Sequence, residues 1–488
     1  MAHRGSTLFA SRLWNGDKSP MNSQSDAILW NSGAPLWGPA GPSCAPGGVP
    51  AGWRAAPMAR SGWIASALAN AGSTPFAPPA ANAASILRGP APAGGVSARS
   101  TVAAGLSSGP SATNAASGAS GGSLGYASVL STLQNAAAGG MTASKFSALQ
   151  AFATGLNQPG GTSVSAYVQQ IADDVILGNS ANAGWNGGSS TATTLGNLGA
   201  TSTQTQADEL IGMWFQGANL PSLDVSSVGA PNYNSTYQAS TLPLYGASGA
   251  PRYTDVNQGV LGDCYLLSAL GEVALQDPAA IENMIVDNGN GTYGVRFFVN
   301  GAPDDVTVNT QLPVMGGGHR WADGSTLEFA NGSTDDWVAL VEKAYAQLNA
   351  QTDAPHGMTL NSASDSYAGI ASGNGSALTE ITGQPESSTG LRSGQSQSTL
   401  QSILSNTASS FQSGQEVLMS TPGSSSGNLV GNHMFMVTAI NAASGAFTIH
   451  NPWAAAYSGS LAMTFNETIQ QLASDNCTLW VTSGHTVA

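Results

Sequence analysis

Residues 257–270 read NQGVLGDCYLLSAL and place one cysteine, Cys264, between a Gly-Asp pair and an apolar run of helical character. Asp263 is a residue type that caps helices, so we expect a helix that starts at or near Cys264. A thiol at a helix N-terminus lies in a field that favours the thiolate, which is the nucleophilic form. Gly259 and Gly262 leave room for a substrate backbone. This stretch alone fits a catalytic nucleophile and an inert buried cysteine equally well.

A nucleophile of this kind needs a base and a residue that orients the base. The stretch NLVGNHMFMVTAI places His433 at the start of an apolar strand, and TIHNPW places Asn451 at the end of the next. Adjacent antiparallel strands would bring the two side chains together, and Trp453 would shield the bond between them. For His433 alone a structural role is the default interpretation. However, Cys, His and Asn occur in the order of papain-like enzymes.

Composition and charge exclude several classes of protein. Of the 488 residues 8% are charged, against about 25% in ordinary globular chains. The net charge is -14, whereas nucleic-acid-binding proteins carry a basic surface.

The three cysteines are far apart and give neither a disulfide framework nor a zinc motif. There is no signal-like apolar segment and no apolar run of about 18 residues, so we expect no membrane span. The compartment stays open between the cytoplasm and export by a non-classical route.

The chain divides into four segments by composition. Residues 1–122 are rich in Gly, Ala, Ser and Pro and are predicted to be disordered, because they bury too little apolar surface. Residues 123–217 carry apolar residues at helical spacing and predict a small helical module. Residues 218–247 are predicted to be an extended linker. Residues 248–488 are predicted to form the main folded domain.

The last segment combines a helical part with many strands. TYGVRFFVNG and DDVTVNTQLPV predict a hairpin, and DDWVALVEKAYAQLN predicts an amphipathic helix. EVLMSTP, the two stretches that carry His433 and Asn451, and TLWVTS predict later strands. A helix followed by antiparallel strands predicts an α+β fold.

These segments resemble the protease core of the calpain family, over about residues 250–485. QGVLGDCYLLSAL is similar to the calpain cysteine motif, VGNHMFMVTAI to the histidine motif and IHNPW to the asparagine motif. DDWVALVEKAYAQLN, SYAGIASGNGSALTEITGQP and LAMTFNETIQQLASDNCTLWV resemble further segments in the same order. The resemblance implies a papain-like core, with a helical subdomain that bears the cysteine and an antiparallel β subdomain.

The resemblance also implies roles for individual residues. Cys264 would be the nucleophile, His433 the general base and acid, and Asn451 the residue that orients the imidazole. The side-chain amide of Gln258 and the backbone N–H of Cys264 would stabilise the oxyanion. Two residues would support this set, Trp453 and Gly262. The implied reaction is hydrolysis of peptide bonds in a protein or peptide substrate, and its chemistry requires no cofactor.

The sequence departs from the calpain pattern at three positions near these motifs. Tyr265 stands where calpains usually carry Trp, Asn432 replaces the usual Gly before the histidine, and Ala454 replaces the usual Gly after the NPW tripeptide. None of the three changes removes a group with an implied catalytic role.

Calcium is implied by the resemblance at one site. Asp255 matches a carboxylate ligand of the first calpain calcium site, and Asp335 stands where that site uses Glu. Backbone carbonyls would complete the oxygen shell. The second site is expected to be absent, because its first acidic ligand maps to Tyr457. The alternative for both aspartates is a solvated loop acid or a helix cap.

Two other functions remain open at this stage. Cys-His-Asn cores also carry out transamidation, and the other alternative is a protein on this fold that only binds a partner. The presence of all four implied catalytic residues argues against a purely binding role. The helical module directly precedes the core, and its position leads to the hypothesis of a pro-segment that covers the cleft.

Overall fold

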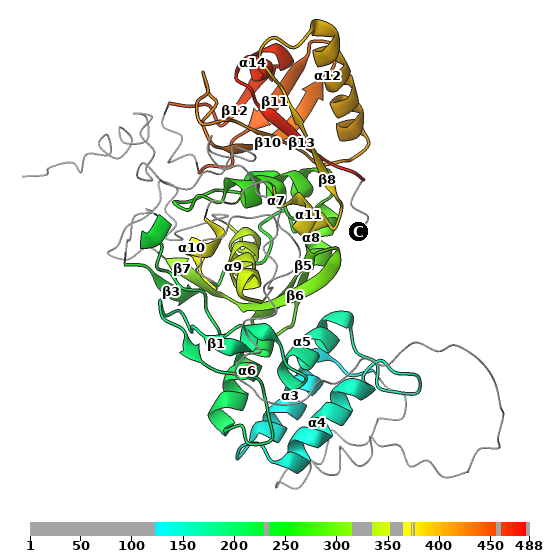
Figure 1. Ribbon diagram of the computed structural model, residues 1–488, viewed down its shortest axis with the longest axis vertical. Coiled ribbons are helices and arrows are strands. Elements are labelled where there is room, and N and C mark those ends of the chain that lie inside the picture. The colour runs from blue at the N-terminus through cyan, green and yellow to red at the C-terminus, as the bar shows by residue number, and fades with distance from the viewer. Residues whose placement is uncertain are drawn as a thin grey trace, which may run out of the picture.

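The computed structural model describes residues 123–228, 234–314, 334–351, 365–371, 373, 376–454 and 460–484. The predicted disorder of residues 1–122 and the second calcium position at Tyr457 lie outside these residues. The described chain forms three parts stacked along one axis (Figure 1). Helices α3–α6 lie at one end, a six-stranded sheet lies at the other, and the part that contains α7 and α9 lies between them.

The N-terminal part is helical, as the apolar spacing predicts. Its elements are α3 (Tyr126–Ala137), α4 (Ala143–Gly155), α5 (Ala166–Ile176), η1 (Ser180–Ala183), β1 (Gly184–Trp185), β2 (Thr193–Thr194) and α6 (Gln204–Gln216). The hydroxyl of Thr142 accepts a hydrogen bond from the backbone N–H of Lys145 and so caps the N-terminus of α4. Leu149, Ile171 and Trp214 share one buried core.

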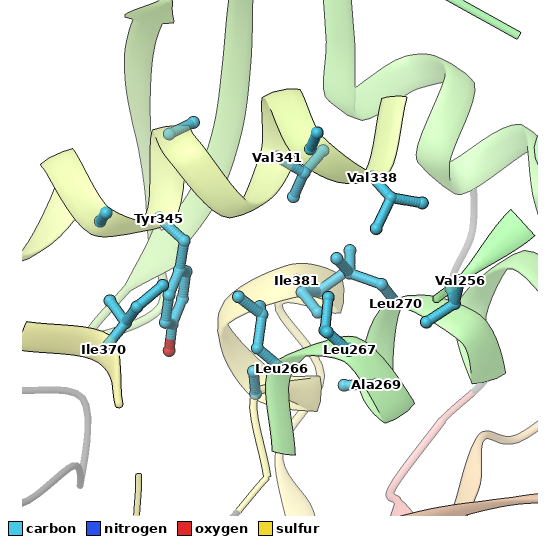
Figure 2. Packing of buried hydrophobic residues seen from close by; sticks show 14 of the residues in the cluster. Val256, Leu266, Leu267, Ala269, Leu270, Val338, Val341, Tyr345, Ile370 and Ile381 are labelled. Atoms are coloured by element: carbon cyan, nitrogen blue, oxygen red, sulfur yellow. The ribbon is translucent and has the colours of Figure 1, made fainter. Parts of the chain in front are cut away.

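The middle part packs two helices against each other beside a small sheet. Its elements are η2 (Ser226–Val228), β3 (Thr236–Ala239), η3 (Tyr253–Asp255), α7 (Cys264–Gln276), α8 (Pro278–Met284), β4 (Ile285–Asp287), β5 (Thr292–Val299), β6 (Ala302–Asn309), β7 (Gln311–Val314), α9 (Trp337–Gln351), α10 (Tyr367–Ile370) and α11 (Leu378–Thr382). Strands β5 and β6 form the predicted hairpin. Val338, Val341 and Tyr345 lie on one face of α9 because of their helical spacing, and they point toward the leucines of α7 (Figure 2).

The C-terminal part is an antiparallel sheet of six strands in the order β12-β11-β10-β9-β13-β8. Its elements are β8 (Glu386–Gly390), α12 (Gln397–Gln412), β9 (Val417–Ser420), β10 (Met434–Asn441), β11 (Ala446–His450), β12 (Thr464–Thr468), α14 (Ile469–Ser474) and β13 (Thr478–Thr482). The strands predicted from the sequence are confirmed. Together with the middle part they give the α+β fold that was expected.

The middle and C-terminal parts meet where α7 packs on β10. The hydroxyl of Ser268 donates to the backbone oxygen of Met434 at 3.0 Å. The thioether of Met436 packs directly on Gly271, where an added Cβ atom would force the Met436 side chain to move. This close approach brings the N-terminus of α7 to the start of β10.

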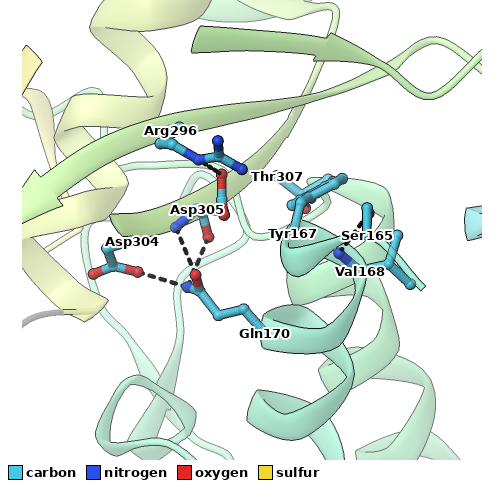
Figure 3. Close-up of polar contacts among 8 residues, drawn as sticks. All are labelled: Ser165, Tyr167, Val168, Gln170, Arg296, Asp304, Asp305 and Thr307. Carbon is cyan, nitrogen blue, oxygen red and sulfur yellow. Dashed lines mark hydrogen bonds and ion pairs between the residues drawn. The ribbon is translucent and has the colours of Figure 1, made fainter. Parts of the chain in front are cut away.

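The N-terminal helices pack on the β5–β6 hairpin (Figure 3). The Tyr167 hydroxyl lies 2.8 Å from Oγ1 of Thr307, and Nε2 of Gln170 donates to Oδ1 of Asp304 at 2.8 Å. The predicted linker at 218–247 is not a free connector, because β3 pairs with β7 of the middle part. In Figure 1 these helices lie at the opposite end of the middle part from the six-stranded sheet. The described helices therefore do not cover the junction of α7 and β10, contrary to the pro-segment hypothesis.

Candidate active site

Cys264 is the first residue of α7, as the sequence predicts, and it is fully buried. Asp263 occupies the N-cap position, but its side chain makes no capping hydrogen bond. Its carboxyl group is buried and instead meets Gln258 and Glu342. The predicted N-cap position of Asp263 is thus confirmed, although its carboxyl turns inward to other side chains.

His433 and Asn451 come together at the adjoining ends of β10 and β11. Nε2 of His433 lies 2.9 Å from Oδ1 of Asn451. The backbone N–H of Trp453 donates to the same Oδ1 at 3.1 Å, which identifies that atom as the acceptor oxygen. Nε2 of His433 must then carry the proton. In the neutral ring this leaves Nδ1 as the basic nitrogen.

Aromatic side chains enclose the imidazole of His433. The ring centroids of Trp453 and Phe435 lie 5.0 Å and 4.7 Å from that of the imidazole. Burial lowers the pKa of His433 to about 4, although the hydrogen bond to Asn451 acts in the opposite direction. The resting imidazole is therefore neutral at pH 7 and able to accept a proton.

The thiol of Cys264 lies beside the residue that follows the histidine. The backbone N–H of Met434 donates to Sγ of Cys264 at 3.4 Å. This contact joins the start of α7 to the start of β10 and brings the sulfur to the strand end that carries His433. A backbone N–H directed at sulfur favours its anionic form.

Gln258 is tied to the asparagine motif through its backbone. Its N–H donates to the oxygen of Pro452 at 2.7 Å, and its own oxygen accepts from Ala454 at 3.1 Å. Its side-chain Nε2 donates to the oxygen of Leu261 at 2.7 Å and to Oδ1 of Asp263 at 3.3 Å. Both side-chain N–H groups of Gln258 therefore have protein partners in this structure.

The remaining residues around the motifs fit their local backbone. Gly262 is half-buried in the bend that leads into α7. Tyr265 donates its hydroxyl to the backbone oxygen of Ile370 at 3.0 Å, so the aromatic ring is firmly packed. Asn432 has φ of 53°, a left-handed conformation that Asn tolerates better than most residues. Ala454 is buried beside the Gln258 loop.

Asp255 and Asp335 lie near each other at the start of α9. Oδ2 of Asp255 accepts from the indole N–H of Trp337 at 3.1 Å. Asp335 is buried, and its Oδ1 has no hydrogen-bond partner among the described residues. Burial, followed by the charge of Asp255, raises the pKa of Asp335 to about 7. The carboxylate oxygens of the two aspartates, including the unbonded Oδ1 of Asp335, are ligands of the type that calcium prefers. No group of three or more His, Cys, Asp or Glu gathers for a metal in the described ranges, so backbone carbonyls would have to supply the other ligands.

Sequence reasoning missed two features of this site. One is the N–H of Met434 on the thiol, which has no signal in the side chains. The other is the contact of Asp263 with Glu342, one residue of the amphipathic stretch DDWVALVEKAYAQLN. A charged residue on the buried face of α9 was the available signal for this second contact.

A cysteine at a helix N-terminus, beside a His-Asn pair on an antiparallel sheet, is the arrangement of a papain-like cysteine peptidase domain. Residues 241–471 match the model of the family described as calpain family cysteine protease. The chain therefore carries a calpain-family protease domain in these residues.

Several curated proteins are similar to this part of the chain. The calpain-2 catalytic subunit of Gallus gallus is 33% identical over 134 residues, which cover 26% of this chain and 18% of that protein. The calpain-1 catalytic subunit of Homo sapiens is 31% identical over 156 residues, covering 28% and 20%. The calpain-type cysteine protease DEK1 of Arabidopsis thaliana is 30% identical over 220 residues, covering 42% and 9%. The chain thus spans a fifth or less of the length of these relatives.

Proposed function

We propose that this protein is a cysteine endopeptidase that hydrolyses peptide bonds with Cys264, His433 and Asn451. One observation carries the proposal: Asn451 holds Nε2 of His433 at 2.9 Å, while the next backbone N–H along the strand holds the sulfur of Cys264. The calpain-family domain supports peptidase chemistry. A protein or peptide substrate follows from the family, and its sequence preference is not part of the proposal.

In the first half of the reaction, Nδ1 of His433 takes the thiol proton and Sγ of Cys264 attacks the peptide carbonyl carbon. The carbonyl π electrons move to oxygen and form an oxyanion. The imidazolium then gives its Nδ1 proton to the amide nitrogen, the C–N bond breaks, and the amine leaves a thioester behind. The bond to Asn451 keeps the ring oriented through both proton transfers.

In the second half, water attacks the thioester and gives a proton to Nδ1 of His433. The tetrahedral intermediate collapses, the C–S bond breaks, and the sulfur regains the proton from His433. The acid product leaves and the resting thiol is restored. Trp453 and Phe435 keep bulk water away from the His433–Asn451 bond, which strengthens it.

The oxyanion would be stabilised by the backbone N–H of Cys264 and by the side chain of Gln258. Gln258 has to release one of its present hydrogen bonds to do so. The bond to Asp263 is the longer of the two at 3.3 Å and is the one that would be exchanged.

A calcium ion, if bound, would be held by Asp255 and Asp335. Its charge would offset the repulsion between the two carboxylates, and it would take no part in bond making or breaking. Calcium dependence of the peptidase is therefore a separate proposal from its mechanism.

The test compares the full chain with Cys264→Ser in casein cleavage and in labelling by iodoacetamide, each with and without a calcium chelator. We expect the wild type to cleave casein and to be labelled at position 264, and the serine variant to do neither, with labelling located by mass spectrometry because Cys44 and Cys477 remain in both proteins. An added primary amine that became incorporated into casein without cleavage would instead favour transamidation. Equal cleavage by the serine variant would remove the proposal.

A further inference from the structure

A cavity of about 180 Å³ lies between the N-terminal helical part and the middle part of the molecule. Its walls come from η1 and the chain that follows it, from α6, from α9 and from the segment just before α10. None of the described residues that line it belongs to the proposed catalytic set or to the calcium ligands. The cavity is therefore separate from the candidate active site.

The floor of the cavity carries two buried oxygen atoms that need a hydrogen-bond donor. Gln347 of α9 is 1% exposed and Asp365 is 5% exposed. Oε1 of Gln347 and Oδ1 of Asp365 accept no hydrogen bond from any residue that the structure describes. A buried acceptor without a donor is energetically unfavourable. Both residues line the cavity, which is the space from which a donor can reach them.

The amide N–H groups beside these oxygens already have acceptors. Nε2 of Gln347 donates to the backbone oxygen of Asn219, and Nδ2 of Asn219 donates to Oδ2 of Asp365 at 2.8 Å. Nδ2 of Asn186 donates to the backbone oxygen of Asp365 at 2.8 Å. Oδ1 of Asn219 accepts from the backbone N–H groups of Asn186 and Gly187 at 2.7 Å and 3.0 Å, which fixes the orientation of this amide. The atoms left open to a ligand are thus acceptors, so the ligand has to donate.

The charge of Asp365 favours a cationic ligand. Lys343 lies on the same helix as Gln347, but its ammonium donates to Asn309 and Gln311. Within the described ranges Asp365 forms no ion pair. Burial raises the pKa of Asp365 to about 7, against its hydrogen bonds and the charge of Lys343, which lower it. A bound cation would supply the missing partner and favour the ionised carboxylate.

The remaining wall of the cavity is apolar and leads to the surface. Met213 of α6 is buried and Ala181 is half-buried, whereas Ala183 and Ala192 are exposed and mark the opening. Such a combination of apolar wall and few polar groups is typical of sites for organic ligands. A hydrated metal ion would gain nothing from the methyl and thioether groups.

The number of free oxygen atoms selects the kind of cation. A guanidinium prefers both oxygens of a carboxylate, but Oδ2 of Asp365 already accepts from Asn219. An ammonium is a compact charge with separate N–H donors, so it can reach one oxygen of Asp365 and one of Gln347. An alkyl chain on the ammonium would lie against the apolar wall.

We propose that this cavity binds a short aliphatic primary amine in its ammonium form, which donates to Oδ1 of Asp365 and Oε1 of Gln347 and places its alkyl chain against Met213. Because the cavity joins η1 and α6 to α9, the ligand would hold the N-terminal helices on the protease domain. Binding involves no covalent step and is independent of the reaction at Cys264.

The test follows thermal unfolding of the full chain at pH 8 in the presence of a calcium chelator, with n-butylammonium chloride as the probe. An alkylamine is protonated at this pH, because its pKa is about 10. We expect a saturable rise of about 2–5 °C in the unfolding temperature. Isothermal titration calorimetry should give one bound amine per chain. Two control compounds, n-butanol without the charge and tetramethylammonium without an N–H donor, should give no saturable rise.

Three variants connect the response to the cavity. Asp365→Asn replaces the carboxylate by an amide of the same size, and we expect the rise to be lost. Gln347→Met removes one acceptor at similar length, and we expect the affinity for the amine to fall about tenfold. Asp304→Asn is the matched control, because it changes an aspartate at the same junction but outside the cavity. It should keep the full response, and each variant is compared with its own amine-free unfolding temperature.

The absence of any saturable response of the wild type to n-butylammonium would show that the cavity holds only water, and would overturn the proposal. An equal response to n-butanol or to tetramethylammonium would overturn it as well, because neither compound can make the contacts described. A full response retained by Asp365→Asn would place the amine elsewhere.

Discussion

The backbone N–H of Met434 donates to Sγ of Cys264 at 3.4 Å, across the junction of the two parts that form the site. The donor is a backbone N–H, which among substitutions of Met434 only proline would remove. The bond also means that the position of the Cys264 sulfur depends on how α7 packs on β10. Mutations along that contact are therefore expected to affect activity without touching the reacting groups.

The buried imidazole makes folding sensitive to acid. The pKa of His433 is about 4 in the folded chain, against about 6.5 when unfolded. The unfolded chain therefore binds more protons between these values, and stability is lost as pH falls from 6.5 to 4. The loss is on the order of 3 kcal/mol. Urea unfolding of wild type and His433→Gln at several pH values checks this, and a difference that stayed constant from pH 7 to pH 4 would contradict it.

The amide of Asn451 is expected to act through orientation of the ring. Asn451→Ala removes the acceptor for Nε2 of His433, and we expect kcat for casein cleavage to fall about a hundredfold. Asn451→Asp keeps an acceptor oxygen and serves as the matched variant. It should retain more activity than the alanine variant. Equal loss in both, measured on correctly folded protein by circular dichroism, would count against an orienting role.

Much of the site could be predicted from sequence because short motifs fix local structure. An Asp followed by Cys and an apolar run starts a helix, and two strands joined by a short turn bring His433 and Asn451 together. Where the carboxyl of Asp263 points could not be predicted in this way. It depends on α9, which is distant in sequence and meets α7 only in the folded chain.

The packing of the N-terminal helices was also beyond sequence reasoning. Apolar spacing predicted the helices but not the face on which they would dock. The docking depends on single contacts such as Tyr167 with Thr307, and on glycines that allow close approach. A single hydroxyl or glycine has no periodic pattern in the sequence. The position of the helices before the core was therefore the basis of the prediction, and it led to the hypothesis that they cover the cleft.

Gly271 tests the junction of α7 and β10. A methyl group there would lie 2.2 Å from Sδ of Met436, so Gly271→Ala should destabilise the protein by about 1–3 kcal/mol and lower activity. The double variant Gly271→Ala with Met436→Ala makes room for the methyl group. It should recover stability relative to the sum of the two single changes. Additive effects in thermal unfolding would show that the two residues are not in contact.

A substitution at Asp335 tests the calcium proposal through protein stability, without an activity assay. Asp335→Asn removes the repulsion with Asp255, so we expect the variant to be more stable than wild type at pH 8 without calcium. Calcium should raise the unfolding temperature of wild type and raise that of the variant much less. A calcium response of equal size in both proteins would place the ion elsewhere.

The N-terminal helices are expected to stabilise the protease domain and not to inhibit it. They bury the β5–β6 hairpin, where a Cβ atom at Gly217 would lie 2.4 Å from the backbone carbon of Val308. Removing them, in a protein of residues 218–488 that keeps η2 and β3, should expose that surface and lower the unfolding temperature by several degrees or more. Casein turnover per folded molecule should not rise.

Tyr167→Phe is a milder variant that removes only the hydroxyl next to Thr307, and it should lower stability by about 1 kcal/mol with unchanged turnover. Faster turnover by the shortened protein would restore the view of these helices as an inhibitory pro-segment.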